Sequence, residues 1–356
     1  MLGFDPKAGR AAWTVFLVGL CIAIAYFIRG TLVVLALAIL FAYLLTPIIT
    51  FVRRYLPRRV SPIFALAIVY VALVGILVAA GIAIGSRVAE EASALASKLP
   101  EVVQSQEWQS RIPLPYWLDR TRALGFIKDQ LAARGRDFVP YLQQIGAQVV
   151  VGARYLGFAV LIPVLAFFFL KDGPEMQSSL LGHIPGSRRT MVESILSDID
   201  TLLGQYIRAL VLQALSAFAL YALFLGFTGA PYAILLAAVA GPLEFFPIIG
   251  PLTAGVITAL VTGLSGYPHV LAFIVFWIVL RGFQDYVLIP FLLGEGVELS
   301  PLWILFGVLA GDQIAGIAGM FFSVPVMAIF RVVFVRLNRR ALTQPLEASH
   351  RVCAEE

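Results

Sequence analysis

Long apolar runs recur along this chain from Ala11 to Val335, and they restrict its fold more than any other feature. Hydrophobic residues make up 60% of the 356 residues and charged residues only 13%, whereas a soluble domain carries about 25% charged residues. One membrane span uses about 20 apolar residues, so a single anchor does not account for this composition. The sequence predicts an all-α polytopic membrane protein. It excludes most soluble enzymes, disordered regulators and nucleic-acid-binding proteins.

Basic residues beside the apolar runs predict the orientation in the membrane. The runs at residues 11–28, 31–52 and 62–85 predict the first three spans, and the runs at 149–170 and 209–227 predict the fourth and fifth. The loop after the second run contains four arginines, Arg53, Arg54, Arg58 and Arg59. By the positive-inside rule this loop faces the cytoplasm, and it shares that side with the N-terminus. Arginines near residue 340 predict a cytoplasmic C-terminus as well.

Composition divides the chain into four predicted regions. Residues 1–85 hold three spans, 86–148 form an extramembrane insertion, 149–340 form a transport region with broken helices, and 341–356 form a cytoplasmic tail. Two stretches show one apolar helical face: Phe138, Leu142, Ile145 and Val149, then Val192, Leu196, Ile199 and Leu203. The first predicts a helix that packs on a neighbour or lies on the bilayer, and the second suits the membrane interface.

Glycine, proline and charge interrupt the apolar sequence between residues 231 and 335. Five interruptions occur, at residues 241–251, 263–269, 281–290, 294–301 and 311–319. Irregular backbone at membrane depth survives only where it is buried in protein or lines a wet cavity. These segments are therefore the candidate functional sites. Two topologies fit them: residues 231–264 form a re-entrant pair, or each run crosses the bilayer.

The segment GPLEFFPIIGP, residues 241–251, carries the strongest signal. Pro247 and Pro251 remove backbone donors, Gly250 permits unusual dihedral angles, and Glu244 sits among them. A carboxylate near the bilayer midplane is costly unless it is used or paired. Glu244 is predicted to bind substrate or a cation, or to carry a proton. The structural alternative is a helix-end cap at the headgroup level.

Two further polar groups belong to the predicted pathway. Arg281, Gln284 and Asp285 share one helical face, as a cluster that faces the pathway or as an Arg281–Asp285 pair closed on itself. Asp312 and Gln313 occupy a predicted break between two apolar runs, where they complete the same site or make a turn. The complete set of candidate pathway residues is Glu244, Pro247, Gly250, Pro251, Arg281, Gln284, Asp285, Asp312 and Gln313.

Few signals of other chemistry appear. Residues 263–266 spell GLSG, a pattern of rhomboid-like intramembrane serine proteases, with Ser265 four residues before His269. That dyad needs its histidine on another helix, so a glycine-rich loop is the preferred interpretation. Three histidines and two cysteines stand in no ligand motif, and no Walker A pattern occurs. We predict no enzyme activity, no metal and no cofactor.

Several segments resemble the autoinducer-2 exporter (AI-2E) family of bacterial membrane transporters, from about Trp13 to Arg340. They are FFFLKD at residues 167–172, EFFPIIGP at 244–251, residues 285–290, and GIAGMFFSVP, which contains Gly316, Gly319 and Pro325. Two departures stand out: Ala209 and Leu210 replace a glycine and a glutamine after Tyr206 and Arg208, and Gln284 replaces an acid common in the family.

The resemblance implies about eight transmembrane helices in a bacterial inner (plasma) membrane, some of them broken, and an insertion after the third. It implies export of a small polar solute such as an autoinducer-2-like signalling molecule, or exchange of Na⁺ or Li⁺ for protons. It also implies a homo-oligomer, such as a pentamer, with an elevator-like movement. The expected partners are the lipid bilayer and the small polar solute or cation; no nucleic-acid partner is expected.

Overall fold

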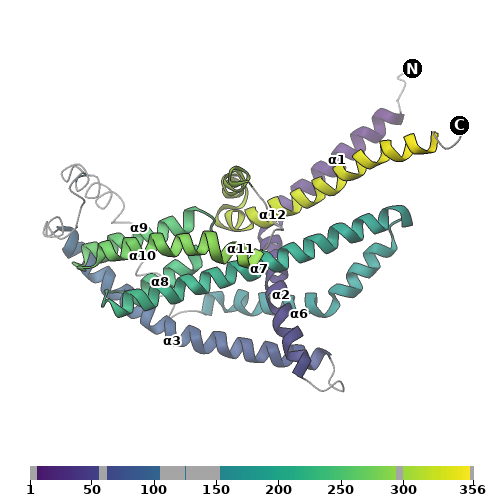
Figure 1. The fold of residues 1–356 in the computed structure, drawn as a ribbon. Helices are drawn as coiled ribbons and strands as arrows, with labels where there is room; N and C mark the ends of the chain where they lie inside the picture. Colours follow the sequence, from purple (N-terminus) through teal and green to yellow (C-terminus); the bar gives the residue numbers. More distant parts are fainter. Residues whose placement is uncertain (1–5, 56–61, 105–124, 126–152, 294–299, 353–356) are drawn as a thin grey trace.

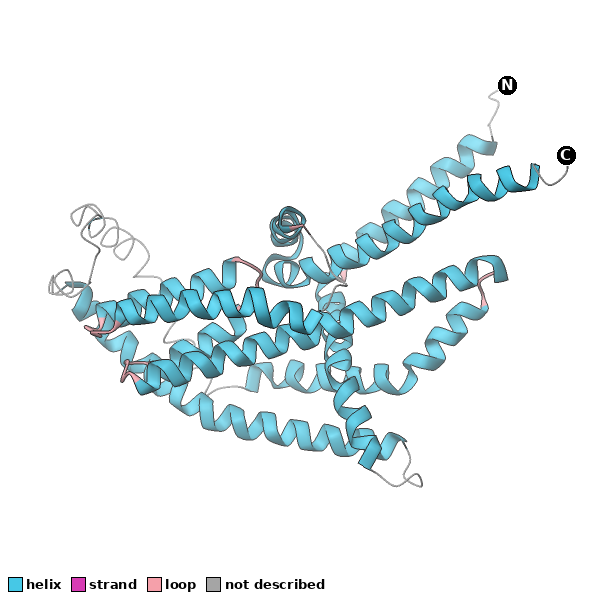
Figure 2. Cartoon of the chain, in the orientation of Figure 1, coloured by secondary structure: helices cyan, strands magenta, loops and turns pink. Residues whose placement is uncertain are grey.

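The computed structural model describes residues 6–55, 62–104, 125, 153–293 and 300–352, and its elements are helical. Figures 1 and 2 show long helices, and the connections drawn as described loops or turns are short. The elements are α1 (Pro6–Phe27), α2 (Arg29–Tyr55), α3 (Pro62–Gln104), α6 (Ala153–Gly182), α7 (Gly186–Phe227), α8 (Ala233–Leu243), α9 (Ile249–Leu264), α10 (Val270–Phe283), the π-helix η1 (Gln284–Leu288), α11 (Ile289–Leu293) and α12 (Pro301–Val352). The predicted all-α class is confirmed.

Several helices are long and apolar enough to cross a bilayer. Among the described residues there are five such segments, Arg29–Val52, Leu66–Lys98, Arg188–Phe227, Val270–Leu292 and Leu302–Asn338. Side chains on their outer faces remain apolar: on α10, Leu271, Val275 and Ile278 are exposed, while Phe273 and Leu280 on the other face are buried. A helix that is apolar on both its buried and its exposed faces suits a lipid environment. The chain is a multi-pass membrane protein.

The largest cluster of buried apolar side chains among the described residues includes part of α7. This helix crosses the middle of the molecule (Figure 1), where it packs against α2, α8, α11 and α12. Tyr221 and Leu225 of α7 join buried side chains of α3, α8, α9 and α10 in one cluster. Phe224 of α7 stacks on Phe276 of α10 with ring centroids 4.3 Å apart. α7 is thus the element against which the broken helices are positioned.

Polar contacts connect α7, α8 and their neighbours. Near the start of α7, Arg336 of α12 donates from Nε to Oδ2 of Asp198 at 2.7 Å, and the Tyr43 hydroxyl of α2 donates to Asp200. At the start of α8, Oε2 of Glu91 accepts the backbone N–H of Leu235 at 2.8 Å. Glu91 therefore caps a helix of the transport region from α3. Such long-range contacts are not visible in local sequence patterns.

Two predicted boundaries do not interrupt a helix. α3 continues past Gly85 to Gln104, and α7 joins the second amphipathic stretch to the span predicted at residues 209–227. Charged residues alone do not end a helix, because they retain high helix propensity. Other predictions lie outside the described residues: most of the insertion, with Phe138, Leu142, Ile145 and Val149, the start of the fourth span, and Arg58 and Arg59.

α8 and α9 form a hairpin beside α7. At 1.5 Å per residue, the 11 residues of α8 rise about 16 Å, roughly half of a bilayer core. Gln213 of α7 contacts the turn between α8 and α9, and it lies 14 residues, about 21 Å, from the Phe227 end of α7. The loops before α8 and after α9 lie at the same end of the molecule (Figure 2). This arrangement favours the re-entrant pair over two complete crossings.

α12 is also a folded-back element. Its helical dihedral angles are interrupted at Ala315 and at Gly316, whose φ is +58°. A Cβ atom on Gly311 would lie 2.3 Å from the carbonyl oxygen of Gly319, so the two arms of α12 touch backbone to backbone. The predicted break at Asp312 and Gln313 is therefore displaced to Ala315–Gly316. Gly316 supplies the positive φ that residues with a Cβ rarely adopt.

Candidate functional site

The turn between α8 and α9 brings the strongest sequence motif against α7. Glu244 follows the last residue of α8, and Ile248 precedes α9 with φ +65°. A positive φ is strained for a β-branched residue, and such strain concentrates at functional sites. A Cβ atom on Gly250 would lie 1.7 Å from the carbonyl oxygen of Leu243. Only glycine fits there, because α9 begins in backbone contact with the end of α8.

Glu244 is the centre of a polar cluster in this turn. It is 5% exposed, and its Oε2 accepts hydrogen bonds from Nε2 of Gln213 at 2.9 Å and from a guanidinium nitrogen of Arg281 at 3.0 Å. The same nitrogen of Arg281 lies 3.3 Å from Oε1. Three elements, α7, the α8–α9 turn and α10, therefore meet at one carboxylate. The burial cost of its charge is offset by an ion pair and by an amide donor.

Arg281 connects Glu244 to the π-helix. It donates to Oε1 of Gln284 at 3.2 Å and to Oδ1 of Asp285. The Gln284 side chain is fully buried and donates to the Ser216 hydroxyl of α7 at 3.2 Å. The π-turn of η1 begins at Gln284, and π-turns inside α-helices recur at functional sites. The Arg281–Asp285 pair forms, but it is not closed on itself, because Arg281 also donates to Glu244 and Gln284.

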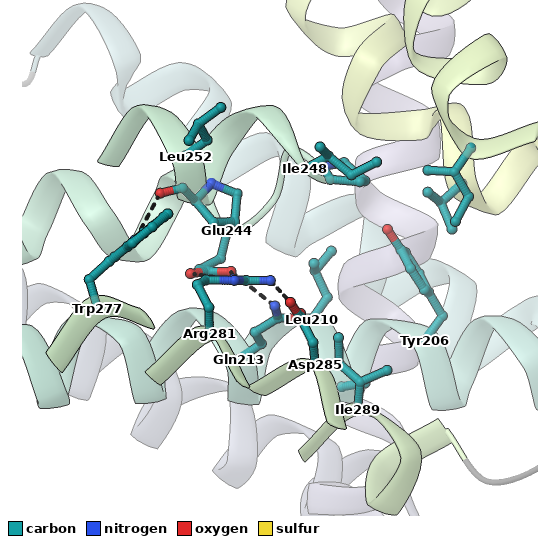
Figure 3. A pocket seen from close by; sticks show the side chains of 15 residues that line it. Tyr206, Leu210, Gln213, Glu244, Ile248, Leu252, Trp277, Arg281, Asp285 and Ile289 are labelled. Atoms are coloured by element: carbon teal, nitrogen blue, oxygen red, sulfur yellow. Dashed lines mark hydrogen bonds and ion pairs between the residues drawn. The ribbon is translucent and has the colours of Figure 1, made fainter. Parts of the chain in front are cut away.

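A cavity of about 610 Å³ opens onto this cluster (Figure 3). Its polar wall contains Gln213, Glu244, Arg281 and Asp285, and Nε1 of Trp277 donates to the Pro251 carbonyl at 3.3 Å. The remaining lining residues are Tyr206, Ala209, Leu210, Pro247, Ile248, Pro251, Leu252, Ile289, Ile304 and Val324. An apolar cavity with a few convergent polar groups is the usual form of a small-molecule site.

Most of the candidate pathway residues come together here. Five line the cavity: Glu244, Pro247, Pro251, Arg281 and Asp285. Oε1 of Gln284 accepts a hydrogen bond from Arg281. Gly250 permits the close approach of α9 to the end of α8. Asp312 and Gln313 lie elsewhere: Asp312 is exposed, and Gln313 lines a second cavity of about 620 Å³ with Arg29 of α2. Because the α12 break lies after these two residues, they stay on its first arm.

Four polar or aromatic residues of the site, Tyr206, Gln213, Ser216 and Trp277, are not among the candidates that the sequence predicts. Gln213 and Ser216, which hold Glu244 and Gln284, are polar residues within the apolar run at 209–227, and a buried amide inside a span was an available signal. Tyr206 was noted only as part of a family motif. Trp277 gave no signal, because an aromatic residue inside a span is ordinary.

The GLSG segment has a structural role. The Ser265 hydroxyl donates to the Val261 carbonyl at 2.7 Å, and Gly266 turns the chain after α9 with φ +74°. The His269 ring meets the Tyr267 ring edge-on. These contacts shape the turn between α9 and α10. Within the described ranges, no group of three or more His, Cys, Asp or Glu residues is placed to hold a metal ion.

Comparison with known proteins agrees with this architecture. The profile described as "AI-2E family transporter" matches residues 15–339. The chain belongs to the AI-2E family. It is 27% identical to "Putative permease PerM" of Escherichia coli K12 over 92% of this chain and 93% of that one. It is 23% identical to "Putative transport protein YueF" of Bacillus subtilis over 83% and 81%.

Another AI-2E relative matches over a shorter stretch. The chain is 29% identical to "Putative transport protein YrrI" of Bacillus subtilis, and this match spans about half of each chain, 52%. These relatives are named as transport proteins or permeases. Together with the apolar helices, membership of the AI-2E family supports a role in membrane transport.

Proposed function

We propose that this chain is a secondary transporter that exports a small polar solute, such as an autoinducer-2-like signalling molecule. The observation that carries the proposal is the cavity between broken helices, with the buried Glu244–Arg281 pair in its wall. Broken helices that place a few polar groups near the bilayer midplane are typical of secondary transporters. The solute pathway is then formed by Glu244, Pro247, Gly250, Pro251, Arg281, Gln284 and Asp285.

The second candidate is a monovalent cation/proton antiporter. It is favoured by the charge balance of the cluster, in which two carboxylates, Glu244 and Asp285, share the guanidinium of Arg281. The remaining negative charge offers oxygen ligands to Na⁺ or Li⁺, and a carboxylate that alternates between cation and proton couples the two fluxes.

We place the protein in a bacterial inner membrane, with both termini in the cytoplasm, because of the arginine-rich loops. We also propose a homo-oligomer, such as a pentamer, on the strength of family membership alone. Native mass spectrometry of the detergent-purified protein tests that assembly, and a purely monomeric spectrum would contradict it.

The test of function is flux in proteoliposomes loaded with a pH-sensitive dye. Wild type and Glu244→Gln are compared under imposed Na⁺ and pH gradients, and efflux of an encapsulated autoinducer-2-like solute is followed in parallel. Solute efflux from wild type that Glu244→Gln loses supports the exporter. Proton flux driven by Na⁺ and lost in Glu244→Gln supports the antiporter. Absence of both activities in the wild type would overturn the transport proposal.

The control variant for this comparison is Glu90→Gln. Glu90 is an exposed carboxylate on α3, outside the lining of the cavity. The same loss of one carboxylate at this position is expected to leave both fluxes unchanged. An equal loss of flux in Glu90→Gln would show that flux depends on the net charge of the protein rather than on a carboxylate at this site.

A further inference from the structure

Tyr206 is a buried side chain of the cavity wall that has an unused polar group. It lies on α7, is 8% exposed, and its hydroxyl has no hydrogen-bond partner among the described residues. In Figure 3 the hydroxyl points away from α7, on the side of the cavity where Ile248 lies. Buried hydroxyls are normally hydrogen-bonded, so an orphan hydroxyl on a cavity wall needs an explanation.

The other polar side chains on the same wall already have partners. Gln213 donates to Glu244, Trp277 donates to the Pro251 carbonyl, and Arg281 donates to Glu244, Gln284 and Asp285. Tyr206 is thus the lining side chain, among those described, whose hydrogen-bonding capacity is left entirely open. A bound molecule would supply the missing partner.

The opposite end of the cavity has a different chemistry. Gln213 follows Tyr206 by seven residues, two turns of α7, which is about 10 Å along the helix axis. There the carboxylates of Glu244 and Asp285 outnumber the single guanidinium of Arg281. Carboxylates keep unused acceptor sites, whereas both terminal nitrogens of Arg281 already donate, one to Glu244 and Gln284 and the other to Asp285. This end favours a neutral or cationic hydrogen-bond donor and disfavours an anion.

Apolar surface separates the two ends. Leu210 lies between Tyr206 and Gln213 on α7, and Pro247 and Ile248 of the α8–α9 turn also line the cavity. Trp277 closes the side next to Pro251. The middle of a bound molecule would therefore contact hydrocarbon and aromatic groups rather than polar ones.

We propose that this cavity binds a small elongated molecule that is neutral or singly cationic. Its donor group lies on Glu244 and Asp285, its middle is apolar, and a second polar group hydrogen-bonds to the Tyr206 hydroxyl. The proposal rests on the proposed function of a solute transporter, and it narrows the solute from any small polar molecule to one with an apolar middle between two polar ends. It makes Tyr206 a determinant of specificity.

Three probes of nearly equal shape test this class: tyramine, phenethylamine and 4-hydroxyphenylacetate. Tyramine has an ammonium and a hydroxyl at opposite ends of a ring, phenethylamine lacks the hydroxyl, and 4-hydroxyphenylacetate replaces the ammonium with a carboxylate. Equilibrium binding of each is measured on the full chain in lipid nanodiscs. The protein is wild type, Tyr206→Phe or Tyr267→Phe.

Tyr267→Phe is a matched control. Tyr267 is 4% exposed, and its hydroxyl is also without a partner in the described part of the chain. It belongs to the core around α9 and α10 and is not among the residues that line the cavity. Both variants therefore remove one buried hydroxyl, but only Tyr206→Phe removes it from the cavity.

We expect wild type to bind tyramine roughly fivefold more tightly than phenethylamine, the ratio that one net hydrogen bond provides. Tyr206→Phe should abolish that preference without weakening phenethylamine, and Tyr267→Phe should keep it. 4-Hydroxyphenylacetate should bind at least tenfold more weakly than tyramine.

Three results would overturn the proposal: a preference that survives in Tyr206→Phe, an anion that binds as tightly as tyramine, or no binding of either amine. If flux in proteoliposomes persists in any of these cases, only the solute class fails. If the expected binding pattern appears in a protein that transports nothing, the binding site stands and the proposed function fails.

Discussion

The carboxylate of Glu244 depends on Arg281, and a substitution at this pair tests that dependence. Arg281→Met keeps the volume of the side chain but leaves a buried carboxylate with only Gln213 as a partner. Removing one partner of a buried ion pair costs about 3 kcal/mol of unfolding free energy. We expect a loss of that size when SDS is titrated into the protein in dodecylmaltoside micelles.

The double variant Glu244→Gln/Arg281→Met separates this effect from lost packing. It removes the uncompensated charge while keeping an amide of the same shape, so most of the lost stability should return. Equal stability of the single and double variants would show that Glu244 does not need Arg281.

A second residue-scale prediction concerns Gly250. Gly250→Ala places a Cβ atom 1.7 Å from the Leu243 carbonyl oxygen, so the α8–α9 turn must open. We expect a loss of more than about 2 kcal/mol in the same SDS titration, in the range of severe backbone strain. Gly226→Ala on α7 meets no described atom within 4 Å and should change stability by less than about 1 kcal/mol. Equal effects of the two substitutions would contradict the close approach.

At the scale of elements, Glu91 of α3 holds the start of α8. Glu91→Leu removes the acceptor of the Leu235 N–H, and loss of a helix cap costs about 1 kcal/mol. Hydrogen exchange followed by mass spectrometry should show faster exchange of the amides in the first turn of α8. Glu91→Gln keeps an acceptor oxygen and should leave exchange slow. Fast exchange in both variants would attribute the effect to charge rather than to the cap.

Sequence patterns predicted the broken elements well but not their partners. Glu244, Pro247 and Pro251 stood out because proline and charge are expensive in hydrocarbon, and that rule is local. The contact of Glu244 with Gln213 joins residues 31 positions apart, so no spacing rule predicts it. The break in α12 lies within the interruption predicted at residues 311–319, but at Ala315–Gly316 rather than at Asp312 and Gln313, because this stretch contains several glycines and only the backbone path distinguishes them.

At the scale of the whole molecule, the ends of α7 should face opposite compartments. Arg188 near its start is exposed, and so is His269, in the α9–α10 loop at the other end of the bundle. With Cys21 and Cys353 replaced by serine, Arg188→Cys should react with a membrane-impermeant maleimide only after spheroplasts are permeabilised. His269→Cys should react in intact spheroplasts. Reaction of both cysteines from one side would contradict the proposed orientation.

α7 runs without interruption from Asp198, which pairs with Arg336, to Gln213 in the cavity wall, about 22 Å away. This stretch has no proline and no π-turn, two usual causes of sharp kinks. We therefore expect this stretch to behave as a rigid body: a displacement at one end tilts or translates the whole stretch instead of bending it. A rigid-body movement of this stretch would carry Tyr206 and Gln213 together, so the two ends of the proposed solute site would shift as one part.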